Sequence, residues 1–119
     1  DFPLVENGNV LLAMTQDALA AHLPRVVKAA NPIVIVDSTF VKEVPKGAYA
    51  IPVTATARDE FQLPMAANVV MFGAFAAISK VVTLESAEGV VARTVTRSVD
   101  QNLAALRRGY ALGEAAKRA

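Results

Sequence analysis

The stretch NVVMFGAFAA, residues 68–77, decides how the rest of this chain folds. Between Met65 and Ile78 only Asn68 carries a polar side chain, so a helix formed here has no face suited to water and must be enclosed on nearly all sides. The apolar run is shorter than the roughly 20 residues that cross a bilayer, so we expect burial in protein. The stretch is therefore predicted to be a core helix.

Gly73 lies in the middle of this predicted helix. Glycine there costs about 1 kcal/mol relative to alanine, and the usual compensation is the close approach of another backbone, here a helix or a sheet. Asn68, as the lone polar side chain of a buried helix, needs a hydrogen-bond partner, which nearby backbone, a subunit interface or a ligand could supply. Asn68 and Gly73 are therefore candidate interface residues.

The composition excludes several classes of protein. The length of 119 residues suits one domain, and the mean hydropathy of +0.38 indicates that another polypeptide covers part of the apolar surface. The net charge of +1 gives no electrostatic reason to expect binding to nucleic acid or to a membrane. The absence of cysteine removes disulfides and thiolate-held clusters, and the single histidine, His22, cannot form a metal site alone.

Three apolar runs predict a parallel sheet. Residues 10–14 (VLLAM) and 33–37 (IVIVD) read as strands covered on both faces, and a helix is predicted at residues 16–29 between them. Such a βαβ unit has parallel strands in nearly all cases. Residues 48–53 (AYAIPV) predict a third strand, with Pro52 at its end or at an edge.

Capping residues predict where helices begin. Three threonines suit helix N-caps. Thr15 would cap the helix at residues 16–29, Thr54 a short helix that ends at residue 61, and Thr83 a helix at residues 84–96. Ser98 and Gln101 have the spacing of a capping box for a last helix. Three strands are few for so many helices, because sheets usually have about four to six strands. We therefore expect a Rossmann-like, three-layer α/β/α domain with a mainly parallel sheet, incomplete at its N-terminus.

Polar residues follow the carboxyl ends of the predicted strands, where open parallel sheets bind ligands. These candidate ligand-binding residues are Thr15, Asp37, Ser38 and Thr54. The alternative is that the two threonines are helix caps and that Asp37 and Ser38 form a turn. The sequence contains no G-x-G-x-x-G turn, phosphate loop or nucleophile elbow, and no catalytic residue or metal site is predicted.

Five segments together resemble a known family. In chain order they are VLLAMTQDAL (10–19), VDSTFV (36–41), YAIPVTATA (49–57), ANVVMFGAFAAI (67–78) and NLAALRRGYALG (102–113). Their order and spacing resemble the gamma subunit of the 2-oxoacid:ferredoxin oxidoreductases, above all members that act on 2-oxoglutarate or an unassigned keto acid. Family members begin with a strand and a G-x-G-G-x-G turn, which this chain lacks. Residues 1–119 therefore resemble the C-terminal two thirds of a gamma domain, with the missing strands upstream or in another chain.

The resemblance implies a subunit of a cytoplasmic enzyme of anaerobic metabolism, which oxidatively decarboxylates a 2-oxoacid, forms the acyl-CoA and reduces ferredoxin. In that family thiamine diphosphate and magnesium lie between the alpha and beta subunits, and iron–sulfur clusters lie in the beta or delta subunit. The gamma component would have a structural or coenzyme A-access role and bind no cofactor alone. Two alternatives remain: an autonomous module that binds a small acid or nucleotide at Thr15, Ser38 and Thr54, and a structural scaffold without a ligand.

Overall fold

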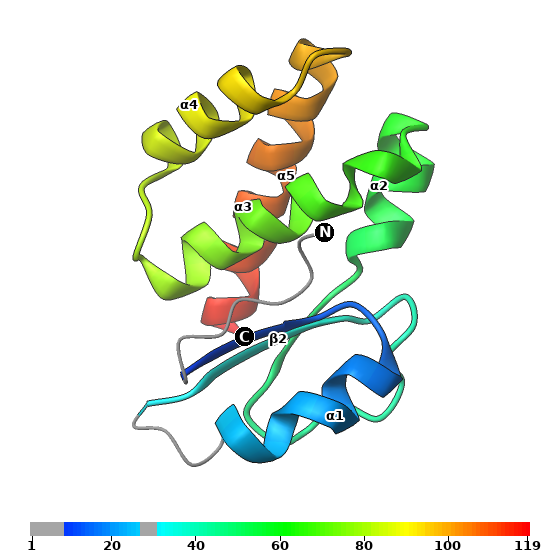
Figure 1. Ribbon diagram of the computed structural model, residues 1–119, viewed down its shortest axis with the longest axis vertical. Coiled ribbons are helices and arrows are strands. Elements are labelled where there is room, and N and C mark those ends of the chain that lie inside the picture. Colours follow the sequence, from blue (N-terminus) through cyan, green and yellow to red (C-terminus); the bar gives the residue numbers. More distant parts are fainter. Residues whose placement is uncertain (1–8, 27–30) are drawn as a thin grey trace.

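The computed structural model describes residues 9–26 and 31–119. The elements in chain order are β1 (Val10–Ala13), α1 (Gln16–Val26), β2 (Ile33–Asp37), β3 (Tyr49–Ile51), α2 (Val53–Phe61), the 3₁₀ helix η1 (Pro64–Ala66), α3 (Ala67–Ser79), α4 (Leu84–Thr94) and α5 (Val99–Arg118). The sheet lies between α1 on one side and the remaining helices on the other (Figure 1). Among the described residues, no helix combines the length and the apolar character that crossing a bilayer requires.

The sheet has three parallel strands in the order β1, β2, β3. Val10 is paired with Ile33, and Ile35 is paired with Tyr49. The β1, α1, β2 succession confirms the predicted βαβ unit. The third strand is shorter than predicted, because Pro52 cannot donate a ladder hydrogen bond and the next residue already begins α2. The predicted end of the first helix, residue 29, lies outside the described residues.

The sheet separates two hydrophobic cores. The core shared with α1 contains Leu11, Ala13, Leu19, Val26, Val34, Val36 and Val41. The core on the other face contains Val10, Leu12, Ile35 and Ile51 together with buried residues of α2, α3 and α5. Successive residues of β1 and β2 thus point into opposite cores, as the two-residue period of a strand requires. This arrangement is the α/β fold with helices on both faces that the sequence predicts.

The predicted core helix is α3, and it packs directly on the backbone of α5. A Cβ atom added at Gly73 would overlap the carbonyl oxygen of Leu106, and one added at Gly109 would overlap the carbonyl oxygen of Val70. Two glycines that face each other in this way let the helix axes approach more closely than any side chain would allow. The prediction that another backbone approaches Gly73 is therefore confirmed. Nine of the residues of α3 are buried: Ala67, Val70, Met71, Gly73, Ala74, Phe75, Ala76, Ala77 and Ile78.

The predicted burial of Asn68 is wrong. Asn68 is exposed in the first turn of α3. Water can therefore solvate its amide, and the side chain needs no partner in the protein.

The predicted helix caps have mixed outcomes. Thr15 and Thr83 act as predicted, since their Oγ1 atoms accept hydrogen bonds from Ala18 N at 3.1 Å and Ser86 N at 3.0 Å. Thr54 does not cap α2, because the helix begins at Val53 and Thr54 is already inside it. Ser98 forms no capping box.

The backbone explains the failure at Ser98. This residue precedes α5 with a φ of 55°, in the left-handed region, and its side chain makes no capping hydrogen bond. The side chain of Asn102 donates instead to the Ser98 carbonyl oxygen at 3.0 Å. A capping box needs an extended backbone at the N-cap, and the turn out of α4 does not provide it.

Candidate functional site

The carboxyl edge of the sheet carries the predicted polar residues, with Asp37 at their centre. Asp37 ends β2 and is fully buried. Its Oδ1 atom accepts hydrogen bonds from Thr39 N at 3.0 Å and Val53 N at 3.0 Å. Its Oδ2 atom accepts from Thr54 N at 3.2 Å and from Thr54 Oγ1 at 2.6 Å. The carboxylate therefore caps the N-terminus of α2, where a negative charge is favoured.

The residues that follow β2 join the same network. Thr39 Oγ1 accepts from Ala55 N at 3.0 Å, and Ser38 N donates to Ile51 O at 2.8 Å. The structure thus brings Asp37, Ser38 and Thr54 together, whereas the hydroxyl of Thr15 is used to cap α1. The hydrogen bonds of this edge are made within the chain, and ligand binding at these four residues stays a prediction.

Gln16 also lies at this edge, after the first strand, and its contacts were not predicted from the sequence. Its Oε1 atom accepts from Lys42 N at 3.0 Å and from Glu43 N at 3.2 Å, and its Nε2 atom donates to Glu43 O at 3.2 Å. These bonds hold the loop after β2 against the start of α1. The signal for them was weak, because a glutamine after a strand is equally typical of an exposed helix surface.

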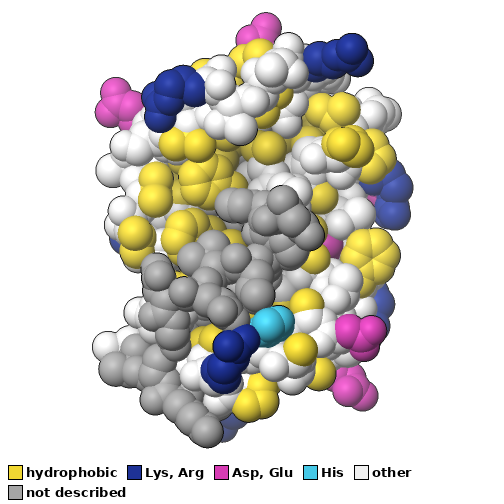
Figure 2. All heavy atoms as spheres, viewed as in Figure 1, with side chains coloured by type: hydrophobic (Ala, Val, Ile, Leu, Met, Phe, Trp, Pro, Cys, Tyr) yellow, Lys and Arg dark blue, Asp and Glu magenta, His cyan; other side chains and the backbone are white. Residues whose placement is uncertain are grey.

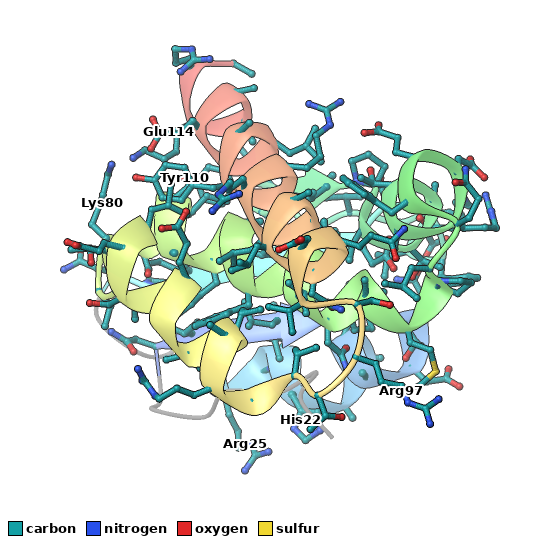
Figure 3. The ribbon with its side chains drawn as sticks, turned by 90° about the horizontal axis from the view of Figure 1, so that it is seen from above. His22, Arg25, Lys80, Arg97, Tyr110 and Glu114 are labelled. Atoms are coloured by element: carbon teal, nitrogen blue, oxygen red, sulfur yellow. The ribbon has the colours of Figure 1, made fainter. Side chains whose placement is uncertain are left out.

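A cluster of charges joins the C-terminal ends of α3 and α5 (Figure 3). Lys80 Nζ donates to Glu114 Oε2 at 3.1 Å and lies 5.9 Å from the centre of the Tyr110 ring. Lys117 Nζ donates to Ala77 O at 2.9 Å. The hydrogen bond from Lys80 lowers the pKa of Glu114, and the same bond raises the pKa of Lys80. The cluster therefore links the end of α3 to the end of α5.

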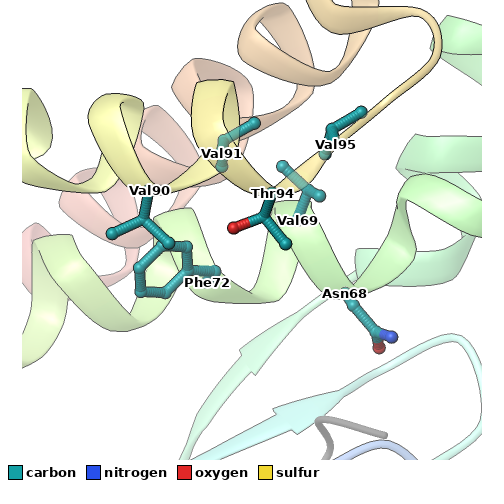
Figure 4. Close-up of a pocket in the computed structure, with 7 residues that line it drawn as sticks. All are labelled: Asn68, Val69, Phe72, Val90, Val91, Thr94 and Val95. Atoms are coloured by element: carbon teal, nitrogen blue, oxygen red, sulfur yellow. The ribbon is translucent and has the colours of Figure 1, made fainter.

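An apolar hollow, which we call the α3–α4 groove, lies between those two helices (Figure 4). It has a volume of about 260 Å³ and is lined by Asn68, Val69, Phe72, Val90, Val91, Thr94 and Val95. Hydrophobic side chains gather on the face of the molecule where α3 and α4 lie (Figure 2). Of the lining residues, the sequence analysis selected Asn68 alone, because the valines read equally well as core.

A more polar pocket continues from the α3–α4 groove toward the start of α5. The two hollows share four lining residues: Asn68, Val69, Thr94 and Val95. The polar pocket has a volume of about 700 Å³ and adds Arg97, Ser98 and Asn102 to its lining. Arg97 lies in the connection between α4 and α5 (Figure 3). Together the hollows form one continuous surface, apolar at one end and basic at the other.

The described residues do not form a site for a metal cofactor. Within the described part of the chain, no group of three or more His, Cys, Asp or Glu side chains is placed to hold a metal ion. Because the sequence contains no cysteine, this chain cannot supply thiolates to an iron–sulfur cluster. His22 is partly exposed on α1, with its Nδ1 atom 2.6 Å from Nη2 of Arg25.

Comparison with known proteins places this α/β fold in a family. Residues 1–112 match the family model described as pyruvate ferredoxin/flavodoxin oxidoreductase. The chain belongs to this family. The resemblance carried by the five segments is therefore confirmed, and so is the α/β fold that it implies.

Curated proteins from Methanocaldococcus and Methanothermobacter are similar to this chain. A protein of Methanocaldococcus jannaschii named 2-oxoglutarate synthase subunit KorC is 32% identical over 116 residues, which are 92% of this chain and 61% of that protein. A protein of the same name from Methanothermobacter marburgensis is 28% identical over 120 residues, which are 94% of this chain and 64% of that protein. The chain thus spans less than two thirds of the length of either relative.

Two solved structures share the fold of this chain. The gamma subunit of a keto/oxoacid ferredoxin oxidoreductase from Geobacter sulfurreducens has a TM-score of 0.83 and 29% identity, and the match covers 90% of this chain and 64% of that subunit. The 2-oxoglutarate:ferredoxin oxidoreductase of Magnetococcus marinus, solved with 2-oxoglutarate, coenzyme A and succinyl-CoA, has a TM-score of 0.73 and 21% identity. That match covers 94% of this chain but only 21% of the longer one, and it shows the fold alone.

Proposed function

We propose that this chain is the gamma component of a multisubunit 2-oxoacid:ferredoxin oxidoreductase. The observation that carries the proposal is the match to the Geobacter gamma subunit, with a TM-score of 0.83 over 90% of the chain. The complex decarboxylates a 2-oxoacid oxidatively, forms the acyl-CoA and passes electrons to ferredoxin. Because two relatives bear the name 2-oxoglutarate synthase subunit, 2-oxoglutarate is the first substrate to test.

The part of this chain is structural or concerns access of coenzyme A, and catalysis belongs to the partner subunits. The described residues offer no metal-binding cluster, and the sequence has no cysteine. Following the resemblance to the gamma subunits of this family, we assign thiamine diphosphate and magnesium to the alpha and beta subunits, and the iron–sulfur clusters to the beta or delta subunit. Coenzyme A is a co-substrate of the complex, and ferredoxin is the electron acceptor. The complex is located in the cytoplasm.

The chain forms the C-terminal two thirds of a gamma domain under this proposal. Its length, 61% to 64% of the curated relatives, supports that assignment. The sheet supports it as well: β1 lies at an edge of the described sheet, yet all four of its residues are buried. Strands buried on both faces suit the interior of a larger parallel sheet.

The competing hypothesis is an autonomous module that binds a small acid or nucleotide at the carboxyl edge of the sheet. Such a module needs polar groups that are free to meet a ligand. Both carboxylate oxygens of Asp37 instead accept hydrogen bonds from within the chain, from Thr39, Val53 and Thr54. These hydrogen bonds favour the subunit role.

Coproduction with the partner subunits tests the proposal. The complete gamma subunit is produced with the alpha and beta subunits of the same organism, purified without oxygen, and assayed for viologen reduction with each of several 2-oxoacids. We expect reduction that requires both a 2-oxoacid and coenzyme A. A gamma subunit that remains monomeric in the presence of the others and binds a nucleotide by itself would contradict the proposal.

A further inference from the structure

We propose that the α3–α4 groove and the adjoining polar pocket are the docking site for another subunit of the oxidoreductase, which inserts an apolar segment with a carboxylate at one end. This inference rests on the proposed function and adds to it the contact surface and the chemistry of the partner. The apolar side chains of the segment occupy the groove, and its carboxylate meets Arg97.

Two apolar side chains of this surface, Val90 and Met65, are left exposed by the described part of the chain. Val90 is 40% exposed on α4, and Met65, at the mouth of the polar pocket, is 87% exposed. The cause lies in α4, which buries only Ala87 and Val91 among its residues. One side of α4 therefore packs inward, while Val90 faces the groove. Contiguous exposed apolar surface of this kind marks sites where proteins associate.

Arg97 determines the charge of the partner. Among the described residues that line the groove and the pocket, it is the sole charged one. It is exposed, and it forms no ion pair with any described residue. An unpaired cation at the rim of an apolar surface selects partners with an acidic group at the matching position. The surface therefore fits an apolar segment with an acidic end better than a neutral or basic one.

The shape of the surface fits a polypeptide segment. The groove runs between two helices and passes without interruption into the polar pocket, because Asn68, Val69 and Thr94 line both. Apolar grooves between helices commonly accept the apolar face of a helix from a partner.

A pair of matched variants tests the proposal in the complete gamma subunit. Val90→Asp places a charge in the groove, and Val44→Asp places one on a valine that is also 40% exposed but lines a hollow beside α1. We expect Val90→Asp to weaken binding to the alpha and beta subunits at least tenfold, and Val44→Asp to leave it within twofold. Met65→Glu, at a residue of the adjoining polar pocket that is 87% exposed, is a second variant on the proposed surface and cannot disturb the core.

A charge reversal tests the acidic end of the partner. Arg97→Glu is compared with Arg93→Glu, which reverses a charge in the last turn of α4 outside both linings. We expect Arg97→Glu to weaken binding at least fivefold at low salt, with a smaller difference at high salt, and Arg93→Glu to have no such effect. Equal effects of the two reversals would overturn the assignment of Arg97.

The outcomes separate this inference from the proposed function. If the unaltered gamma subunit does not assemble, the proposed function fails. If it assembles and Val90→Asp and Met65→Glu assemble equally well, only the docking site is overturned. A loss of the same size in Val44→Asp would also overturn it, because the effect would not be specific to the groove. A dimer of isolated gamma subunits that Val90→Asp abolishes would indicate a second copy of this chain as the occupant.

Discussion

The hydroxyl of Thr54 donates to the carboxylate of Asp37 across 2.6 Å, and this bond ties the end of β2 to the first turn of α2. The same carboxylate receives backbone hydrogen bonds from Val53 and Thr54. This buried carboxylate thus caps a helix that begins 16 residues further along the chain. The contact fixes the position of the start of α2 relative to the end of β2.

Asp37→Ala is expected to destabilise the complete subunit by about 3 kcal/mol or more, because it leaves several buried donors without an acceptor. Thr54→Val removes one donor and should cost about 1 kcal/mol. Unfolding in urea measures both changes. Asp59→Ala is the control, since Asp59 is exposed and forms an ion pair with its neighbour Arg58. A cost at Asp37 no larger than that at Asp59 would contradict the capping role.

Gly73→Ala is expected to destabilise the subunit by about 1–3 kcal/mol, because the new methyl group overlaps the backbone of α5. The control is Gly89→Ala in α4, where a Cβ would meet only the flexible side chain of Arg93 at 3.1 Å. That change should stabilise the helix by up to about 1 kcal/mol, since alanine is the better helix former. Thermal unfolding of both variants gives the comparison, and effects of the same sign would refute the close packing of α3 on α5.

Glu114 is expected to make stability depend on pH. Its hydrogen bond from Lys80 lowers its pKa below the ordinary value of 4.5, so the bond contributes fully above that value and is lost as the pH falls through the folded-state pKa. Unfolding free energies of the unaltered subunit and of Glu114→Gln should therefore converge as the solution is acidified below about 4.5. A difference between Glu114→Gln and the unaltered subunit that stays constant with pH would rule out this linkage.

The sequence predicts those parts of the fold that burial alone determines. The run at residues 67–78 has no polar face, so it had to become the enclosed helix α3, and Gly73 within it required a close neighbour. The apolar strands β1 and β2, with a helix of ordinary length between them, permit hardly any arrangement other than a parallel pair.

The candidate site was less predictable because its interactions are long-range. Nothing near Asp37 in the sequence shows that it caps a helix beginning at Val53, and nothing near Gln16 shows that it binds the loop at residue 42. The groove escaped prediction for another reason. Val90 and Val91 are the same residue type side by side, and only the packing of α4 decides which of them is exposed.

The central claim is that this chain acts as one component of a larger oxidoreductase. Native mass spectrometry of the coproduced subunits, purified through a tag on the alpha subunit, tests it most directly. The account predicts a single complex that contains the complete gamma subunit in equal number with alpha and beta, and that oxidises a 2-oxoacid. A tagged complex of alpha and beta that is active without gamma, with gamma eluting separately, would contradict it.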